Sequence, residues 1–158
     1  MTKENSYDIV IIGGATAGLS AALYGTRARR KTLLLEKGVI GGQISLTEVV
    51  ENYPGIQKIN GFDLAQAMLQ QAESHGLDVE YQEVTGIIKK DNLWEVVTDN
   101  NRFTAKSIII TTGADYNKLE IPGEERLTGR GVSYCATCDG AFFMDQDVCV
   151  VGGGDSRR

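Results

Sequence analysis

Two cysteines near the end of the 158-residue chain have the spacing of a redox-active pair. Cys135 and Cys138 are separated by two residues in the run YCATCDG, so one helical turn would bring their sulfurs together as a dithiol or a disulfide. A helix N-terminus would lower the pKa of one thiol, and Asp139 offers a carboxyl that exchanges protons as thiolates form and leave. The pair therefore predicts thiol–disulfide exchange.

Structural zinc and inert core thiols are the two alternative interpretations of this pair. Zinc takes four ligands, and the other candidates, Cys149 and His75, belong to other predicted elements, so we expect no metal. Free cysteine also buries readily, and we expect that role for Cys149, which lies within an apolar run. His75 is expected at the surface near a helix end, without a Ser-His constellation. Redox chemistry remains the favoured interpretation.

A glycine-rich turn near the N-terminus is the second feature with chemical consequences. An apolar strand, Ile9 to Ile12, precedes it, and a helix is expected from about Ala17 to Arg29. The first glycine of such a turn permits a tight bend, the last lets the helix pack on the strand, and the helix N-terminus offers N–H groups to a pyrophosphate. The residues expected at the pyrophosphate are Gly13, Gly14, Ala15, Thr16, Ala17 and Gly18.

An acidic residue ends the next predicted strand, 31–36. Glu36 occupies the position at which an acid holds a ribose hydroxyl in a dinucleotide site. It would repel a 2′-phosphate, so this first site suits FAD or NAD better than NADP. Ala15 replaces the middle glycine of the fingerprint, and its methyl group narrows the approach to the pyrophosphate.

The strand–helix–strand order predicts a parallel βαβ unit, and the rest of the chain extends it. A long loop at 38–56 is of a length that is usually functional. A helix is expected from Asp63 to His75, and Trp94 is expected to pack within a small antiparallel sheet. The remaining strands are predicted at 77–90, 93–99 and 102–107, with a fully buried strand at 107–114 and another apolar run before Gly152.

Composition excludes several classes of protein. The net charge is −5, and the longest basic run is RARRK at 27–31, so nucleic-acid binding is disfavoured. The polar N-terminus does not resemble a signal peptide and no stretch has the length of a membrane span, so a cytoplasmic protein without membrane association is expected.

Together these motifs closely resemble the NADPH-dependent thioredoxin reductases of the bacterial, low-molecular-weight type. The strings that carry the resemblance include YDIVIIGGATAG, GGQI, TEVVENYPGI, IIITTGA, GRGVSYCATCDGAFF and VVGGGDS. The related alkyl-hydroperoxide-reductase flavoproteins usually carry a proline-histidine spacer between the cysteines.

The resemblance implies an α/β flavoprotein oxidoreductase with two Rossmann-like domains. Residues 1–114 would form a three-layer FAD-binding domain with a small antiparallel β-meander, and 115–158 the linker and truncated start of an NADPH domain with the redox-active disulfide. Beyond the pyrophosphate turn and Glu36, the implied FAD contacts are Lys37, Gly41, Gly42, Gln43, Asn52, Val84, Thr112 and Gly113. The implied NADPH contacts are Gly152, Gly154, Asp155 and Ser156.

The resemblance also implies an electron path from NADPH through FAD and the cysteine pair to thioredoxin. Cys138 would exchange electrons with the flavin, Cys135 would attack the disulfide of thioredoxin, and Asp139 would supply the proton. The intact enzyme would be a homodimer.

Three departures from the family modify this expectation. Family members usually have glycine-proline where this chain has Ala15-Thr16, and a small residue where it has Arg157. They are also about twice as long as this chain. We therefore expect an N-terminal portion that is inactive alone. Two alternatives are an FAD-holding fragment or half-protein that acts as a binding or assembly module, and a flavin reductase that uses another donor such as ferredoxin.

Overall fold

The N-terminal strand, turn and helix form as the apolar pattern predicts. The computed structural model describes residues 5–136 and 140–152, within two compact units, residues 1–113 and 114–158. In the first unit β1 (Ser6–Ile12) leads into α1 (Thr16–Arg27), and β2 (Thr32–Glu36) lies parallel to β1. The predicted parallel βαβ unit is therefore present, with the helix starting one residue earlier and ending two residues earlier than expected.

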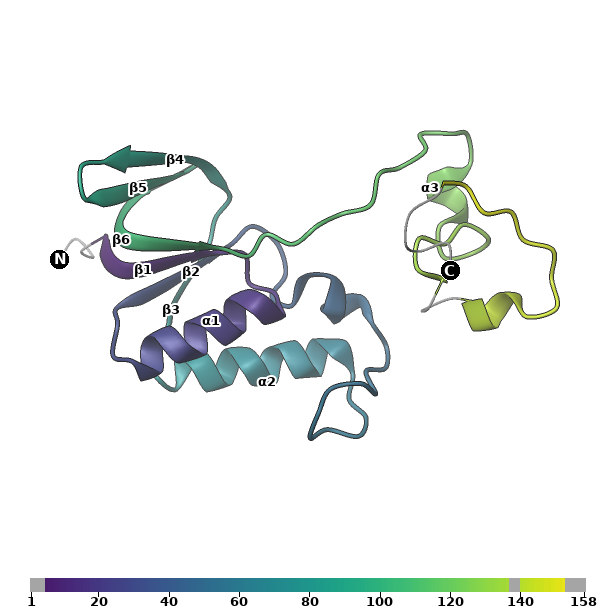
Figure 1. The fold of residues 1–158 in the computed structure, drawn as a ribbon, viewed down its shortest axis with the longest axis horizontal. Helices are drawn as coiled ribbons and strands as arrows, with labels where there is room; N and C mark the ends of the chain where they lie inside the picture. The colour runs from purple at the N-terminus through teal and green to yellow at the C-terminus, as the bar shows by residue number, and fades with distance from the viewer. Residues whose placement is uncertain (1–4, 137–139, 153–158) are drawn as a thin grey trace. The chain divides into compact units, whose positions relative to one another are not determined.

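Six strands form one sheet in the order β3-β2-β1-β6-β5-β4 (Figure 1). β2 and β6 flank β1 in parallel, and β3 extends the parallel part beyond β2. β4, β5 and β6 form the antiparallel meander that the sequence predicts. The bounds of these strands are Asp78–Tyr81 for β3, Val84–Lys90 for β4, Leu93–Thr98 for β5 and Arg102–Ile110 for β6.

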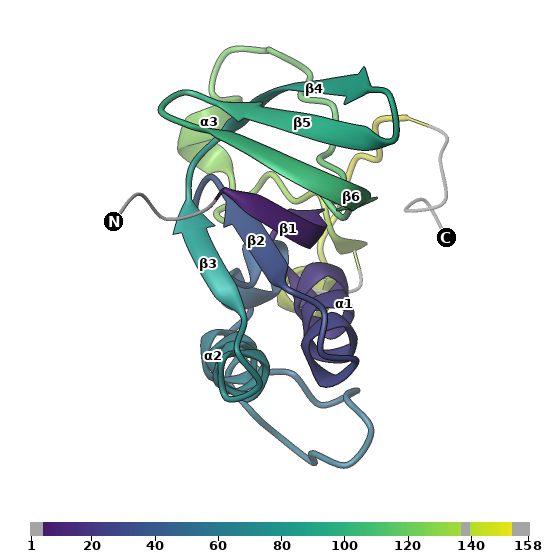
Figure 2. The same cartoon turned by 90° about the vertical axis from the view of Figure 1, so that its left-hand side faces the viewer.

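Two apolar clusters on opposite faces of the parallel strands produce three layers. α1 and α2 (Gly61–Glu73) cover one face, where Leu19 and Leu69 pack with Ile11 and Leu34 of the sheet. The meander lies on the other side, and Phe103 belongs to the cluster of that face (Figure 2). The α/β fold with three layers and a β-meander is confirmed.

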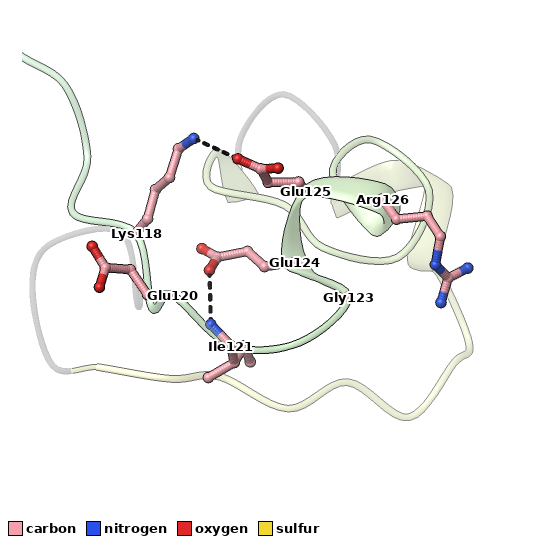
Figure 3. Close-up of a pocket in the computed structure, with 7 residues that line it drawn as sticks. All are labelled: Lys118, Glu120, Ile121, Gly123, Glu124, Glu125 and Arg126. Carbon is pink, nitrogen blue, oxygen red and sulfur yellow. Dashed lines mark hydrogen bonds and ion pairs between the residues drawn. The ribbon is translucent and has the colours of Figure 1, made fainter.

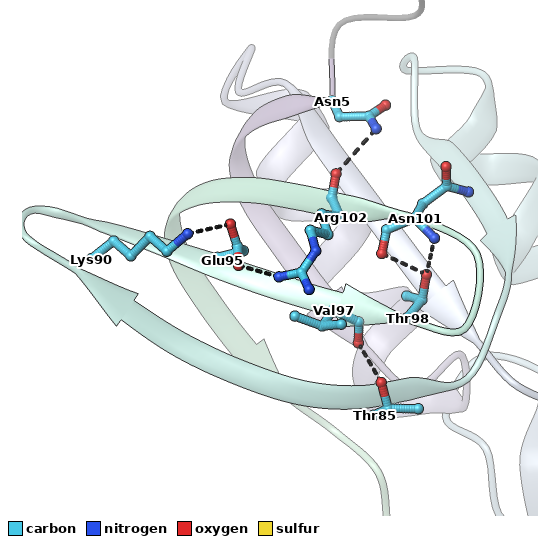
Figure 4. A network of polar contacts seen from close by, with 8 residues as sticks. All are labelled: Asn5, Thr85, Lys90, Glu95, Val97, Thr98, Asn101 and Arg102. Atoms are coloured by element: carbon cyan, nitrogen blue, oxygen red, sulfur yellow. Dashed lines mark hydrogen bonds and ion pairs between the residues drawn. The ribbon is translucent and has the colours of Figure 1, made fainter.

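Polar contacts fix the strands of the meander relative to one another (Figure 4). The Glu95 carboxylate accepts hydrogen bonds from Lys90 Nζ at 2.7 Å and Arg102 Nη1 at 2.6 Å. The hydrogen bond from Lys90, assisted by Arg102, lowers the pKa of Glu95. Trp94 is half-buried beside the apolar cluster, with Lys89 Nζ 4.6 Å from its ring centroid, so its expected packing role is confirmed.

Two strand predictions are wrong in their extent. The expected single strand 77–90 is two strands. β3 stops pairing with β2 after Tyr81, and the chain then enters the antiparallel meander at Val84, which pairs with Thr98 of β5. Residues 102–110 instead form one strand, β6, and residues 111–114 lie beyond its end. Its end is not buried, since Ile110 is 64% exposed. The reason is that β5 pairs with β6 only as far as Ala105, so among the described strands only β1 flanks this end of β6.

The long loop and second helix also differ slightly from the prediction. A short 3-10 helix, η1 (Gly42–Leu46), lies within the loop at 38–56. α2 starts after Asn60, whose Oδ1 accepts from Phe62 N at 2.9 Å, and Asp63 lies in its first turn. His75 is exposed just beyond this helix, as expected.

The second unit contains little regular structure in the part that the structure describes. It has a four-residue helix α3 (Glu124–Leu127), a 3-10 helix η2 (Gly140–Phe143) and an isolated bridge between Thr128 and Val132. Across both described ranges, no helix is long and apolar enough to cross a bilayer.

Candidate functional site: a dinucleotide pocket at the ends of the parallel strands

The turn between β1 and α1 depends on two glycines. Gly13 has a φ of 104°, and a Cβ placed there would overlap the carbonyl oxygen of Thr111. A Cβ on Gly18 would overlap the carbonyl oxygen of Gly13. Thr111 Oγ1 donates toward the carbonyl oxygens of Ile12, at 3.0 Å, and Gly13, at 2.9 Å. The sequence therefore needs glycine at both positions to bring helix, turn and β6 this close together.

The N-terminus of α1 is left open to an anion. Its N-cap is Ala15, which provides no side-chain hydrogen bond, and the first turn of this described helix carries no acidic residue. α2 differs, because Asn60 caps it and Asp63 lies in its first turn. Free backbone N–H groups and the positive end of the helix dipole favour a negatively charged group such as a pyrophosphate.

Glu36 is held at the end of β2 by the turn itself. Its Oε2 accepts from Gly14 N at 2.6 Å, and its Oε1 accepts from Gly38 N at 2.8 Å. A carboxylate has about four acceptor sites, so both oxygens can also accept hydrogen bonds from a diol. This anchored carboxylate beside an open helix N-terminus fits the ribose and pyrophosphate of a dinucleotide.

A cavity of about 210 Å³ lies beside these groups. It is smaller than the roughly 300–1,000 Å³ of pockets that enclose a whole drug-sized ligand, so it suits one end of an extended molecule. Parallel sheets bind ligands outside the carboxyl ends of their strands where the strand order reverses, and β1 occupies that position here. The cavity is lined by Ile12, Gly13, Leu35, Glu36, Lys37, Gln82, Glu83, Val84 and Thr112.

Several residues expected at the FAD are brought together here. Gly13, Glu36, Lys37, Val84 and Thr112 line the cavity. Four others lie along the adjoining turn: Gly14, Thr16, Ala17 and Gly18.

The loop after β2 closes against the same turn. Gly41 N donates to Gly14 O at 2.9 Å, and Gly41 forms an isolated bridge with Ala15. Gly42 and Gln43 then begin η1.

Two other predicted FAD contacts lie apart from the cavity lining. Asn52 is in an exposed loop, and Gly113 follows Thr112 with a φ of 71°. Neither residue lines the cavity.

Sequence reasoning missed Gln82 and Glu83. Gln82 Oε1 accepts from Thr98 Oγ1 at 2.6 Å and Asn101 Nδ2 at 3.2 Å, which ties the β3–β4 connection to the turn between β5 and β6. Glu83 Oε1 lies 3.4 Å from Lys37 Nζ. The signal that could have located them is the polar pair QE, which interrupts the predicted strand 77–90.

The cysteine region is described only in part. Cys135 is disulfide-bonded, and its N–H donates to Ser133 Oγ at 3.1 Å. Cys138 and Asp139 lie outside the described residues, so the roles expected of the pair stay predictions. Among the described residues, no cluster of three or more metal-ligating side chains occurs.

The prediction that Cys149 is buried within a strand is wrong. Cys149 is free and exposed, and the flanking Val148 and Val150 are 64% and 58% exposed. In the described part of the second unit no strand is available to pair with this run, and an unpaired strand leaves its backbone groups unsatisfied. Gly152 has a φ of 109°, while the other expected NADPH contacts, Gly154, Asp155 and Ser156, lie outside the described residues.

A wide concavity in the second unit is formed by a folded loop (Figure 3). Its central acid, Glu124, is only 4% exposed and accepts from Leu119 N at 2.9 Å and Ile121 N at 3.3 Å. Because this carboxylate caps the loop, we assign it a structural role.

Comparison with known proteins relates the whole described chain to one group. The family model for pyridine nucleotide-disulphide oxidoreductases matches residues 7–156. A thioredoxin reductase from Treponema pallidum is 48% identical over 154 residues, which are 97% of this chain and 50% of that protein. The chain spans about half the length of the curated relatives it matches.

Solved structures give the same relationship. The thioredoxin reductase of Streptococcus pyogenes has a TM-score of 0.82 and 46% identity, covering 98% of this chain and 50% of that one. A ferredoxin-flavin thioredoxin reductase from Clostridium acetobutylicum has a TM-score of 0.64 and 29% identity, covering 87% and 48%.

Proposed function

We propose that this chain, which belongs to the pyridine nucleotide-disulphide oxidoreductase family, is the FAD-binding and disulfide-bearing portion of a thioredoxin reductase. The observation that carries the proposal is the anchored Glu36 carboxylate beside the uncapped N-terminus of α1. The family implies a flavin and a nicotinamide cofactor, which we propose are FAD and NADPH. The intact enzyme is proposed to be a cytoplasmic homodimer that reduces thioredoxin.

The first unit holds the cofactor from its adenosine end. The N–H groups of the Gly13–Gly18 turn bind the pyrophosphate, Glu36 accepts from the ribose hydroxyls, and Lys37 and Val84 border the adenosine. Of the other proposed contacts, Thr112 and Gly113 continue toward the flavin, while Gly41, Gly42, Gln43 and Asn52 belong to the loop after β2. When bound, FAD supplies the two-electron chemistry that connects NADPH to the cysteine pair.

The cysteine pair carries out the exchange with thioredoxin. The Cys135 thiolate attacks one sulfur of the thioredoxin disulfide, and the other sulfur leaves as a thiolate. Cys138 then attacks the Cys135 sulfur of the mixed disulfide and releases the second thioredoxin sulfur, while Asp139 delivers a proton. Two thiols of this chain become one disulfide, and one disulfide of thioredoxin becomes two thiols.

NADPH is proposed to bind at Gly152, Gly154, Asp155 and Ser156. The described part of the second unit has no sheet on which a nicotinamide site could be built. We therefore expect the chain by itself to bind FAD without turning over NADPH. Steady NADPH-dependent reduction of thioredoxin by the purified chain would contradict this expectation.

Titration of the purified chain with FAD tests the proposed site. Bound oxidised flavin is yellow and stays with the protein on gel filtration. Glu36→Gln should weaken FAD binding about 10- to 100-fold, because hydrogen bonds to a charged group are lost. Glu51→Gln is the matched control, since Glu51 pairs with Lys58 on an exposed loop. If the chain is incubated with excess FAD and then elutes from gel filtration without bound flavin, the proposal is refuted.

A ferredoxin-dependent reductase is the second candidate, favoured by the similarity to the Clostridium acetobutylicum structure. It differs from the first only in the electron donor. Supplying the longest natural form of the protein with either NADPH or reduced ferredoxin, and following thioredoxin thiols, separates the two.

A further inference from the structure

We propose that Glu83 adds to the selectivity that Glu36 gives the adenosine pocket, by occupying its lysine and so further disfavouring 2′-phosphorylated nucleotides. This inference rests on the proposed function, because it concerns which dinucleotides that same pocket accepts. Its new element is a residue pair, Lys37 and Glu83, that joins two separate segments of the chain within the cavity lining.

The charge of the cavity lining supports this role. Lys37 is the one cation among the nine described lining residues, whereas Glu36 and Glu83 are both acidic. Lys37 Nζ lies 3.4 Å from Glu83 Oε1, so the ammonium group already has a carboxylate partner. The lining as a whole therefore carries one net negative charge.

The backbone that carries Glu83 is fixed from both sides. Gln82 is held by hydrogen bonds from Thr98 and Asn101, and Val84 pairs with Thr98 in the sheet. Figure 4 shows how Thr98 and Asn101 are themselves bonded to each other at the β5–β6 turn. This support keeps Glu83 in the cavity lining, within reach of Lys37, the residue that follows β2.

The consequence concerns a phosphate on the ribose 2′ oxygen. Such a phosphate carries about −1.5 to −2 charges at pH 7, and sites that accept it place a cation nearby. An exposed ion pair such as Lys37–Glu83, with side chains 71% and 56% exposed, contributes little to stability. Its larger effect is electrostatic, because Glu83 cancels the positive charge that a 2′-phosphate would need.

Competition for bound FAD tests the selectivity at this site alone. ADP-ribose and 2′-phospho-ADP-ribose, which differ only in the 2′-phosphate, are titrated against the FAD complex of the full chain at low salt. In the wild type ADP-ribose should compete better. Glu83→Gln should improve competition by 2′-phospho-ADP-ribose about 5-fold, because one negative charge near the phosphate is removed. Competition by ADP-ribose should change less than about 2-fold, as Coulomb interactions with its distant charges are screened.

Two further variants identify the cause. Adding Lys37→Gln to Glu83→Gln should abolish most of the gain, since the freed cation is then absent. Glu51→Gln breaks a comparably exposed ion pair with Lys58, at 3.6 Å, and should leave both competitors unchanged.

The outcomes separate this inference from the proposed function. If the wild type binds FAD but Glu83→Gln leaves the ratio of the two competitors unchanged, the inference is wrong and the FAD site stands. An equal gain in the double variant would show that Lys37 is not the group released, and would also overturn it. If the wild type does not bind FAD, both proposals fail.

Discussion

The turns at Gly13 and Gly152 each follow an apolar run, but they differ in what surrounds them. Gly13 N donates to Leu35 O at 2.8 Å, and Thr111 N donates to Ile12 O at 2.8 Å, so strands on both sides bind the first turn. Among the described residues, a Cβ atom added to Gly152 would meet no atom within 4 Å, and the preceding Val151 is 65% exposed.

This difference shows what turns a glycine motif into a site. The first turn is positioned by three chain segments, the ends of β1, β2 and β6, which come together only because β1 lies between two parallel neighbours. That arrangement fixes Glu36 beside the helix N-terminus. A similar string without neighbouring strands has the residue types of a binding turn but not their geometry.

The largest expected effect comes from adding one methyl group to each turn. Gly18→Ala places a Cβ against the carbonyl oxygen of Gly13, so we expect a loss of about 3 kcal/mol or more in the free energy of unfolding of the first unit. Gly152→Ala adds the same group in the second unit, at a φ of 109°, so any backbone strain falls on that unit and the unfolding free energy of the first unit should stay unchanged. Urea unfolding followed by circular dichroism measures both.

Equal effects of the two substitutions would break the comparison. A tolerated Gly18→Ala would mean that helix and turn separate easily, so the close packing would not be what holds the site. A large loss of first-unit stability from Gly152→Ala would instead show that the second turn supports structure in the first unit.

The first turn could be predicted because the elements that form it are consecutive in the sequence, but the whole cavity could not. β1, α1 and β2 are consecutive, so their apolar periods alone indicate where Glu36 must lie. Gln82 and Glu83 join the cavity through pairings of β3 with β2 and of β4 with β5, which the sequence period does not encode. The run before Gly152 has the period of a buried strand, yet burial requires neighbours that a local pattern cannot supply.

Alkaline pH should weaken the first unit through a buried tyrosine. Burial, followed by the charge and hydrogen bond of Asp78, raises the pKa of Tyr7 to about 12 from 10.0. Below pH 10 this contribution to stability is fully present. Between about pH 10 and 12 the unfolded chain loses the proton first, and about 2 kcal/mol of stability is lost.

Urea unfolding at pH 9 and pH 11.5 measures this loss, and Tyr7→Phe should remove most of it. In the folded chain, tyrosinate absorbance should show a late-titrating component that is absent from Tyr7→Phe. If the wild type and Tyr7→Phe lose stability equally with pH, Tyr7 is not the group responsible. The test concerns the first unit specifically, because Tyr7 lies near the start of β1 and packs edge-on against Phe103.

The second unit should respond to the loss of its buried carboxylate only locally. Glu124→Ala leaves the N–H groups of Leu119 and Ile121 without their acceptor, at a cost of about 1–2 kcal/mol in opening the loop. Hydrogen exchange at these two amides should become about 5- to 30-fold faster. The neighbouring Glu125→Ala is the control, since the Glu125 side chain is 88% exposed. A fall in the unfolding free energy of the first unit would contradict the independence of the two stabilities.

The smallest effect is expected at Ala15, the position where the first turn departs from the glycine pattern. Its φ of −82° needs no glycine, so Ala15→Gly introduces no relief of backbone strain. Glycine is a better N-cap than alanine but loses more backbone freedom on folding, so the two effects oppose each other and the unfolding free energy should change by less than about 0.5 kcal/mol. Removing the methyl group gives a pyrophosphate closer access to the backbone, and FAD affinity should rise about 2- to 3-fold.

Ala21→Gly removes the same atom from the middle of α1, where glycine costs up to about 1 kcal/mol, and should bring no gain in affinity. FAD titration of both variants beside the wild type measures the difference. Unchanged FAD binding in Ala15→Gly would show that the methyl group does not limit the approach, so that the open helix N-terminus and Glu36 suffice. A gain confined to Ala15→Gly would instead show that the Ala15 methyl group weakens FAD binding, even though the neighbouring strands fully position the first turn.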